Sequence, residues 1–211
     1  VYLIRHGETQ WNRDGIHQGH MDSPLTEHGQ RQAQQLGERF ACSDIKFDAI
    51  YSSDLGRTVQ TVEAICKPIG QTDLIQLEKG LRERALGILE GLTYPQIAEK
   101  LPEDHRLHTS GDPHYRPENG ESWADLFERA SGELRRIAQM HQGETILCVS
   151  HGGVVSMALR DCMGVDLFTP RRFHIPNTAL NILEWHDAFW DLRTWGDVAH
   201  FEGEKALDEM L

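Results

Sequence analysis

Short apolar runs alternate with longer amphipathic stretches along the chain, and this alternation predicts a series of strands and helices. Short runs rich in apolar residues are typical of β-strands, and they cover residues 1–5, 48–52, 74–77 and 145–150. In the stretches between and after them, apolar residues recur at the three- to four-residue period of a helix. We therefore expect helices over residues 25–40, 55–69, 94–101, from 122 onward, and 154–162.

Strands that alternate with helices are typical of a parallel sheet covered on both faces. The sequence thus predicts an α/β fold, a three-layer α/β/α sandwich with a mostly parallel central sheet. Its 211 residues suit one domain, residues 1–211. The pattern loosens at about 81–122, where glycines, prolines and charges predict a small loop and helical insertion, or lid.

Two further segments of the chain have more specific patterns. Ser122 and Asp125 form a capping-box signal, which predicts the start of the strong amphipathic helix that follows. The aromatic segment 185–195 has the spacing of strands, and it predicts a C-terminal hairpin that packs on the sheet.

Composition and charge limit the partners that the protein can have. The chain is 39% hydrophobic and 26% charged, which is ordinary for a globular protein and argues against disorder. A net charge of −12 would repel nucleic acid and anionic membranes, and no apolar run approaches the ~20 residues of a membrane span. We expect no nucleic acid and no membrane partner, so an anionic substrate needs a local positive cluster. The oligomeric state is left open.

The cysteines indicate the compartment. Cys42, Cys66, Cys148 and Cys162 are far apart, form no C-x-x-C pair and lie within or beside apolar segments. We interpret them as buried free thiols of a reducing environment. The N-terminal segment also lacks the order of a signal peptide, and we expect a cytoplasmic protein.

Candidate chemistry lies at two strand ends. His6 and His151 each end an apolar strand and are each followed by glycine. The carboxyl ends of parallel strands lie at one edge of a sheet, so neighbouring strands would bring both imidazoles together with Arg5 and the N-termini of the next helices, which favour anions. Arg57 follows the second strand and would reach the same edge. Taken singly, Arg5 is better interpreted as an ordinary strand-end cation and Arg57 as a surface charge.

A metal site is the competing interpretation of the other histidines. They lie in polar, loop-like sequence without the carboxylates or cysteines of a metal site, and we expect no metal. These residues are His17, His20, His105, His108 and His114.

Four motifs in order, LIRHGETQWN, SSDLGRT, LRERALGILEG and VSHGG, resemble the histidine phosphatase superfamily, specifically its phosphoglycerate-mutase-like branch. The resemblance spans nearly the whole chain. It implies that His6 attacks phosphorus and becomes a phosphohistidine, and that Glu83 is the proton donor. It also implies that no metal or other cofactor is needed. The phosphate contacts that it implies are Arg5, Arg57, His151, Asn12, Gln18 and Gly152.

Three functions compete within this resemblance. The first is a metal-independent phosphatase that hydrolyses a small phosphomonoester, a small phosphorylated metabolite. The second is a phosphoglycerate mutase, but the mutases of this family carry a longer insertion with adjacent arginines. Here residues 93–119 offer only the separated Arg106 and Arg116 as candidate anion contacts. The third, a catalytically silent phosphate-binding module, is disfavoured by the intact set of motif residues.

Overall fold

The computed structural model describes residues 1–201; the predicted domain continues to residue 211, and residues 202–211 lie outside the described residues. The described chain forms a six-stranded sheet with the strand order β3-β2-β4-β1-β5-β6. The first four strands in the sequence are parallel, and the last two are antiparallel. The strands are β1 (Tyr2–Arg5), β2 (Ala49–Ser52), β3 (Ile75–Leu77), β4 (Ile146–Ser150), β5 (Leu180–His186) and β6 (Phe189–Asp197). The predicted, mostly parallel α/β sheet is confirmed.

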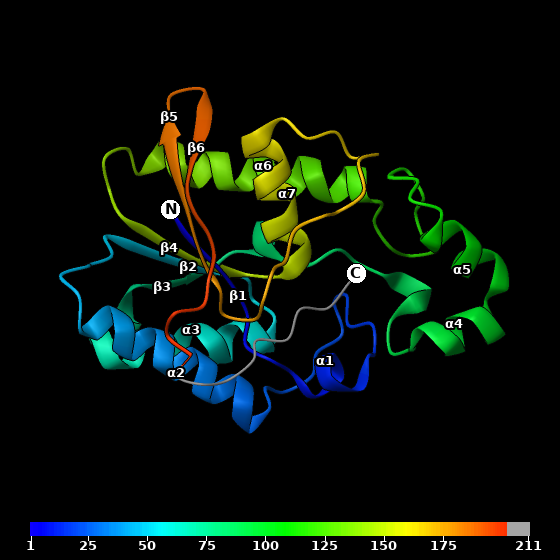
Figure 1. The fold of residues 1–211 in the computed structure, drawn as a ribbon, viewed down its shortest axis with the longest axis horizontal. Coiled ribbons are helices and arrows are strands. Elements are labelled where there is room, and N and C mark those ends of the chain that lie inside the picture. Colours follow the sequence, from blue (N-terminus) through cyan, green and yellow to red (C-terminus); the bar gives the residue numbers. More distant parts are fainter. Residues whose placement is uncertain (202–211) are drawn as a thin grey trace.

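Helices cover both faces of the sheet (Figure 1). Consecutive strand residues point to opposite faces, so that in β1 Leu3 packs with α6 (Trp123–Met140) and α7 (Gly152–Met163). Ile4 packs on the other side with α2 (Glu27–Ala41) and α3 (Gly56–Ile69). The two cores are separated by the sheet, which confirms the three-layer sandwich.

The helix ends follow local capping. The predicted capping box of Ser122 and Asp125 is present at the start of α6. A second box, between Thr9 and Asn12, begins a short helix that the periodicity did not predict, α1 (Gln10–Asp14). Five residues are too few for a helical period to be visible in the sequence. Single 3₁₀ turns occur at Thr72–Leu74, Lys79–Leu81 and Gly87–Leu89.

The insertion contains two helices, one more than expected. The predicted helix is α4 (Tyr94–Lys100), and α5 (Pro102–Thr109) follows it with a proline at its first position. Both lie at one end of the molecule, beyond the main layers (Figure 1). Leu86, Leu89 and Ile97 form a small core of their own there. The insertion thus has its own packing and projects from the sandwich.

The C-terminal hairpin differs from its prediction. It was expected to pack on the sheet, but β5 is hydrogen-bonded into the sheet beside β1, with Ile4 opposite Leu180. Asn181 stabilises this pairing because its Nδ2 donates to the Leu3 carbonyl at 3.0 Å. The hairpin extends the sheet by two antiparallel strands.

The cysteine prediction is correct for two of the four residues. Cys66 and Cys148 are buried, whereas Cys42 is exposed and Cys162 is half-buried; all four are free thiols. Cys42 is the C-cap of α2, two residues after the buried Phe40, and it faces solvent.

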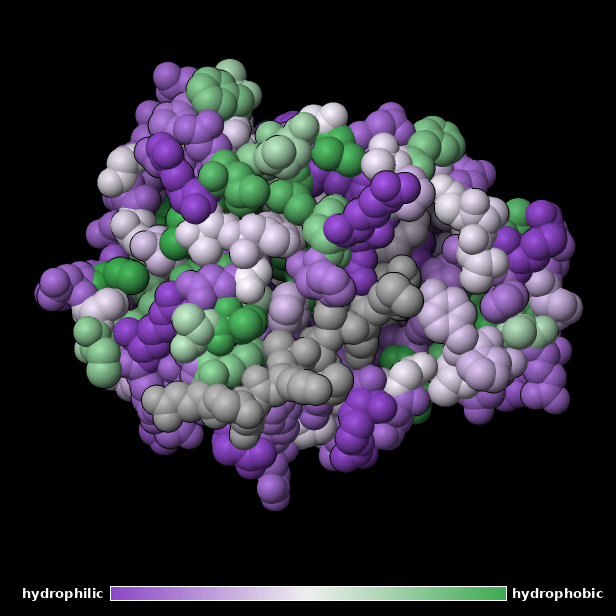
Figure 2. Space-filling model, viewed as in Figure 1, coloured by the Kyte–Doolittle hydropathy of each residue, from purple (hydrophilic) through white to green (hydrophobic). Residues whose placement is uncertain are grey.

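The surface is mostly hydrophilic on the face shown in Figure 2, where hydrophobic residues form separated patches. Within residues 1–201, no helix has the length and apolar composition needed to cross a membrane.

Candidate active site

The ends of β1 and β4 bring the two motif histidines together. These strands are parallel neighbours with Arg5 opposite Ser150, and the N–H of His6 donates to the Ser150 carbonyl at 2.9 Å. The rings of His6 and His151 consequently lie edge to face, with centroids 5.3 Å apart. The convergence predicted from the two strand ends is confirmed.

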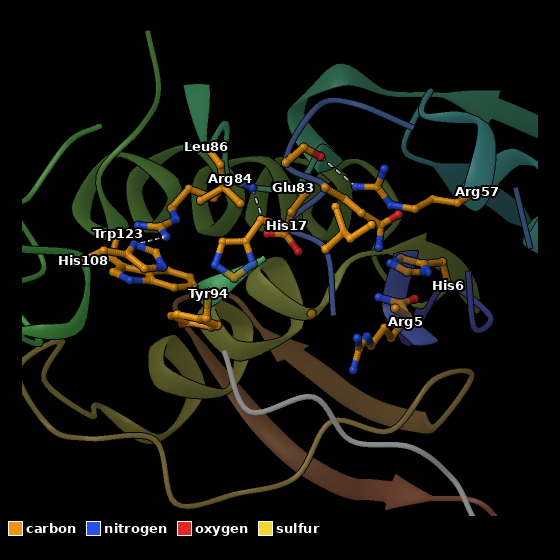
Figure 3. A pocket seen from close by; sticks show the side chains of 15 residues that line it. Arg5, His6, His17, Arg57, Glu83, Arg84, Leu86, Tyr94, His108 and Trp123 are labelled. Carbon is orange, nitrogen blue, oxygen red and sulfur yellow. Dashed lines mark hydrogen bonds between the residues drawn. The ribbon is translucent and has the colours of Figure 1, made fainter. Parts of the chain in front are cut away.

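A small pocket of about 70 Å³ opens at this edge of the sheet. A single water needs at least ~10–15 Å³ of such volume, so the pocket suits a small ligand. Figure 3 shows Arg5, His6 and Arg57 at one end of it, and Arg84, Tyr94, His108 and Trp123 at the other. All the predicted site residues except His151 line it: Arg5, His6, Asn12, Gln18, Arg57, Glu83 and Gly152.

His6 is held in one tautomer. Its Nδ1 donates to the Gly7 carbonyl at 2.8 Å, which leaves Nε2 with the lone pair. The His6 carbonyl in turn accepts from Asn177 Nδ2 at 2.9 Å. Burial, reinforced by the charges of Arg57 and Arg5, holds the pKa of His6 well below its ordinary value. The imidazole is therefore neutral at pH 7, and its unprotonated nitrogen can act as a nucleophile.

Two buried guanidinium groups supply positive charge at this end. Arg5 Nη1 donates to the Ile175 carbonyl at 2.7 Å. Arg57 is 1% exposed and donates to the carbonyls of Met21 and Gly19 at 2.9 and 2.8 Å. Burial lowers the pKa of Arg57, yet a guanidinium stays protonated in proteins. Two guanidinium groups thus lie at this end of the pocket in a protein of net charge −12, and Arg57 is also paired with Asp22 at 3.3 Å.

His151 lies behind the pocket lining. Its Nδ1 accepts from Arg57 Nε at 3.2 Å, so Nε2 carries the proton and donates to Ser53 Oγ at 2.8 Å. Both ring nitrogens are engaged, and burial together with the Arg57 charge holds the pKa of His151 well below its ordinary value. Direct contact of His151 with a phosphate stays a prediction. Ser53, which the sequence analysis did not single out, stands in the SSDLGRT motif that contains Arg57.

Glu83 is fixed by backbone donors. The N–H of Arg84 donates to Oε1 at 2.8 Å, and the N–H of Gly153, in the first turn of α7, donates to Oε2 at 3.0 Å. A Cβ on Gly153 would lie 2.0 Å from Oε1, so only glycine lets the carboxylate approach this closely. The Glu83 carbonyl accepts from His20 Nε2 and Arg129 Nη2. The carboxylate is thereby anchored at the N-terminus of a helix.

Asn12 and Gln18 are buried at the pocket wall. Asn12 Oδ1 accepts the N–H of Thr9 at 3.0 Å in the capping box of α1. Gln18 is 8% exposed. Gly152 is the first residue of α7 and also lines the pocket.

The other end of the pocket was missed by the sequence analysis. Its lining comes from several parts of the chain that are far apart in the sequence: His17, Arg84, Leu86, Tyr94, His108 and Trp123. His17 and His108 were expected to be ordinary loop histidines, yet burial lowers the pKa of His17 to about 4 and that of His108 to about 3. The sequence offered no signal because the loop that carries His17 and the helix α5 that carries His108 meet only in the folded chain.

The two arginines expected to contact an anion lie elsewhere. Arg106 is exposed and pairs with Glu103 at 2.6 Å, one turn away on α5. Arg116 pairs with Asp125 at 2.7 Å. Neither lines the pocket, so the anion contacts expected of them are not formed there. Among residues 1–201, no three or more His, Cys, Asp or Glu side chains are grouped to hold a metal ion.

Comparison with known proteins places these residues in a family. The model of the histidine phosphatase superfamily (branch 1) matches residues 1–198. A probable phosphoglycerate mutase, GpmB, of Cronobacter sakazakii is 37% identical over 215 residues, covering 100% of this chain and 98% of that protein. YhfR of Bacillus stearothermophilus has a solved structure with a TM-score of 0.86 and 35% identity, covering 95% of this chain and 98% of the other.

A phosphatase is also among the similar solved structures. Phosphoserine phosphatase of Entamoeba histolytica, in complex with 3-phosphoglyceric acid, has a TM-score of 0.81 and 26% identity. The match covers 94% of this chain and 97% of that one. With the motifs, the sheet order and the paired histidines in agreement, this chain belongs to the histidine phosphatase superfamily, branch 1.

Proposed function

We propose that the protein is a metal-independent phosphatase that hydrolyses a small phosphomonoester through a phosphohistidine at His6. One observation carries the proposal. The hydrogen bond from His6 Nδ1 to the Gly7 carbonyl fixes the neutral tautomer with a nucleophilic Nε2, beside two buried arginines and a carboxylate.

In the first step, Nε2 of His6 forms a bond to phosphorus as the bond from phosphorus to the substrate oxygen breaks. Negative charge on the transferring phosphoryl oxygens is stabilised by positive groups already in place. Arg5 and Arg57 provide these charges, and their carbonyl contacts hold them before substrate arrives. The arginines thus supply the charge that a metal ion supplies in other phosphatases.

Glu83 completes both steps. As the carboxylic acid it gives its proton to the departing alkoxide, and as the carboxylate it then takes a proton from the water that attacks the phosphohistidine. The products are an alcohol and inorganic phosphate, with His6 and Glu83 restored. The two backbone N–H donors fix the position of the carboxylate for these transfers.

The remaining predicted residues position the phosphate. The Oδ1 of Asn12 is engaged by Thr9, so Asn12 would meet a phosphate with its Nδ2 donor group. Gln18 and the N-terminus of α7 at Gly152 line the same pocket and add donors. His151 holds Arg57 through Nδ1, and a direct contact with the phosphate requires release of Nε2 from Ser53.

The alternative is a phosphoglycerate mutase, a function carried in the names of relatives such as GpmB. A mutase must return the phosphoryl group to a gripped phosphoglycerate while excluding water. The insertion of this chain places Arg106 and Arg116 in ion pairs away from the pocket. That placement favours the phosphatase.

The setting follows from the same features. A small phosphorylated metabolite suits a pocket of this size, and the similar phosphoserine phosphatase of Entamoeba histolytica forms a complex with 3-phosphoglyceric acid. Four free thiols suit a reducing cytoplasm.

An assay of phosphate release on a panel of phosphomonoesters, run in a chelator, tests this proposal. The panel includes 3-phosphoglycerate with its bisphosphate cofactor, and isomerisation is scored separately. We expect full phosphate release in the chelator and little isomerisation. Loss of activity that a divalent metal restores would refute the mechanism, and isomerisation faster than release would establish the mutase instead.

A further inference from the structure

The outer end of the pocket holds one arginine in an aromatic enclosure. Arg84 is 3% exposed, and its guanidinium carbon lies 4.0 Å from the centre of the Trp123 ring. Figure 3 shows its side chain extending away from Glu83 toward Trp123 and His108. This guanidinium is therefore packed against aromatic rings on the opposite side of the pocket from His6.

Arg84 is not satisfied by the residues around it. Its Nη2 lies 3.5 Å from His108 Nδ1, while Nε and Nη1 are buried and have no hydrogen-bond partner within residues 1–201. No carboxylate of the described chain forms an ion pair with it. Burying a cation without partners is costly, and a site that keeps such donors free at a pocket wall is suited to an anionic ligand.

Among the side chains of this outer end, Arg84 carries the positive charge, and the Glu83 and Glu121 carboxylates act on it electrostatically without forming an ion pair with it. Burial lowers the pKa of Arg84 only to about 10, so the guanidinium is protonated at pH 7. Burial and the Arg84 charge lower the pKa of His17 to about 4 and of His108 to about 3, so both are neutral. Burial raises the pKa of Tyr94, which keeps its hydroxyl neutral as well. A ligand therefore meets one positive charge among uncharged aromatic walls.

We propose that Arg84 is a specificity-determining residue that binds a carboxylate of the substrate, so that the favoured substrates are small phosphomonoesters carrying a carboxylate. The inference rests on the proposed function. A carboxylate fits better than a second phosphate because one guanidinium matches one negative charge, whereas the reacting phosphate has Arg5, Arg57 and the N-terminus of α7. The small pocket also limits the length between the two groups.

This subsite differs from the anion contacts expected from the sequence. Arg106 and Arg116 lie on the outside of the insertion, in ion pairs with Glu103 and Asp125. Arg84 instead follows Glu83 directly, and the N–H of Arg84 helps to fix the Glu83 carboxylate. The carboxylate subsite and the proposed acid are therefore adjacent in the chain, which couples recognition of the substrate to placement of its leaving group.

Binding of a matched ligand pair tests the subsite. 3-Phosphoglycerate and glycerol 3-phosphate differ in having a carboxylate or a hydroxymethyl group at the same position. Calorimetry with His6→Ala protein avoids turnover and measures the ratio of the two dissociation constants. A charge-assisted hydrogen bond predicts about 10- to 100-fold tighter binding of 3-phosphoglycerate.

The ratio should fall close to one when Arg84→Met is added, since methionine keeps the packing on Trp123 without the charge. Arg84→Lys should keep part of the ratio. Arg116→Met, the same replacement at an exposed arginine, is the control and should leave the ratio unchanged. Melting curves show whether each variant is folded.

Equal binding of the two ligands to His6→Ala protein would overturn the inference without any Arg84 variant, as would failure of both to bind. A preference that persists in folded Arg84→Met protein would also overturn it. The proposed function is tested apart from this, by whether wild-type protein releases phosphate from nitrophenyl phosphate, which has no carboxylate. Release without a carboxylate preference would reject the subsite alone.

Discussion

At the scale of single residues, the position of the Glu83 carboxylate depends on the absence of a side chain at Gly153. Oε1 occupies the place where a Cβ of residue 153 would lie, and Oε2 accepts the N–H of the same residue. Because the end of a glutamate side chain is flexible, an added methyl group would move the carboxylate more easily than the backbone. If Glu83 has its proposed role, a change at this position should affect catalysis more than stability.

We predict that Glu83→Gln and Gly153→Ala share a phenotype that depends on the leaving group. An alkoxide needs a proton, whereas a nitrophenolate departs without one, so the first turnover of an alkyl phosphate should slow by about two to four orders of magnitude in Glu83→Gln. The burst of nitrophenol should change far less. Gly153→Ala should show the same bias to a smaller degree.

Rapid-quench measurement of the first turnover separates this step from hydrolysis of the phosphohistidine, in which Glu83 is also proposed to act. Gly132→Ala is the matched control, because a Cβ at Gly132 on α6 would meet no atom within 4 Å. Equal slowing of alkyl and nitrophenyl substrates would show that Glu83 is not the leaving-group acid.

At the scale of elements, what the sequence predicts depends on how local the determining contacts are. The four parallel strands and helices α2, α3, α4, α6 and α7 follow from periodic burial, and each predicted limit lies within two residues of the observed one. Helices α1 and α5 were not predicted. The neighbouring β1 and β4 strands then place Arg5, His6 and Gly152 together. This end of the site is predictable because motif and strand end coincide.

The outer end of the pocket is not predictable in this way. His17 comes from the loop after α1, His108 from α5 and Trp123 from the start of α6, and their ring contacts exist only in the folded chain. No periodicity connects these positions.

The place of the C-terminal hairpin is not predictable from local pattern either. Its aromatic spacing predicts strands, but its partner, β1, is determined by pairing over a long sequence separation.

At the scale of the whole molecule, buried neutral histidines make stability depend on pH. Burial lowers the pKa of each below its ordinary value of 6.5, to about 4, 3 and 4 for His17, His108 and His200 and well below 6.5 for His6 and His151. In the unfolded chain each of these imidazoles takes up a proton near pH 6.5, whereas in the folded chain it does so only at lower pH. The free energy of unfolding must therefore fall as pH decreases below 6.5.

We predict that the free energy of unfolding decreases by at most about 1.4 kcal/mol per pH unit for each such imidazole. The range is pH 6.5 to about 5, in which most carboxylates are still ionised. Urea unfolding at a series of pH values measures it. Phosphate buffer must be avoided, because a ligand of the folded state adds stability. A free energy of unfolding that stays constant over this range would show that these histidines are protonated in the folded protein.

In the proposed mechanism, the whole molecule presents His6 as a nucleophile to phosphorus. Transfer of a labelled phosphoryl group to the protein tests this role of His6 directly. The protein is incubated with a labelled phosphomonoester and quenched without acid, and peptide mapping locates the label. We predict label on His6, and no label together with a loss of at least roughly three orders of magnitude in turnover in His6→Ala. The exposed His114→Ala control should label normally. Near-normal turnover in His6→Ala, or label on another residue, would show that His6 is not the nucleophile.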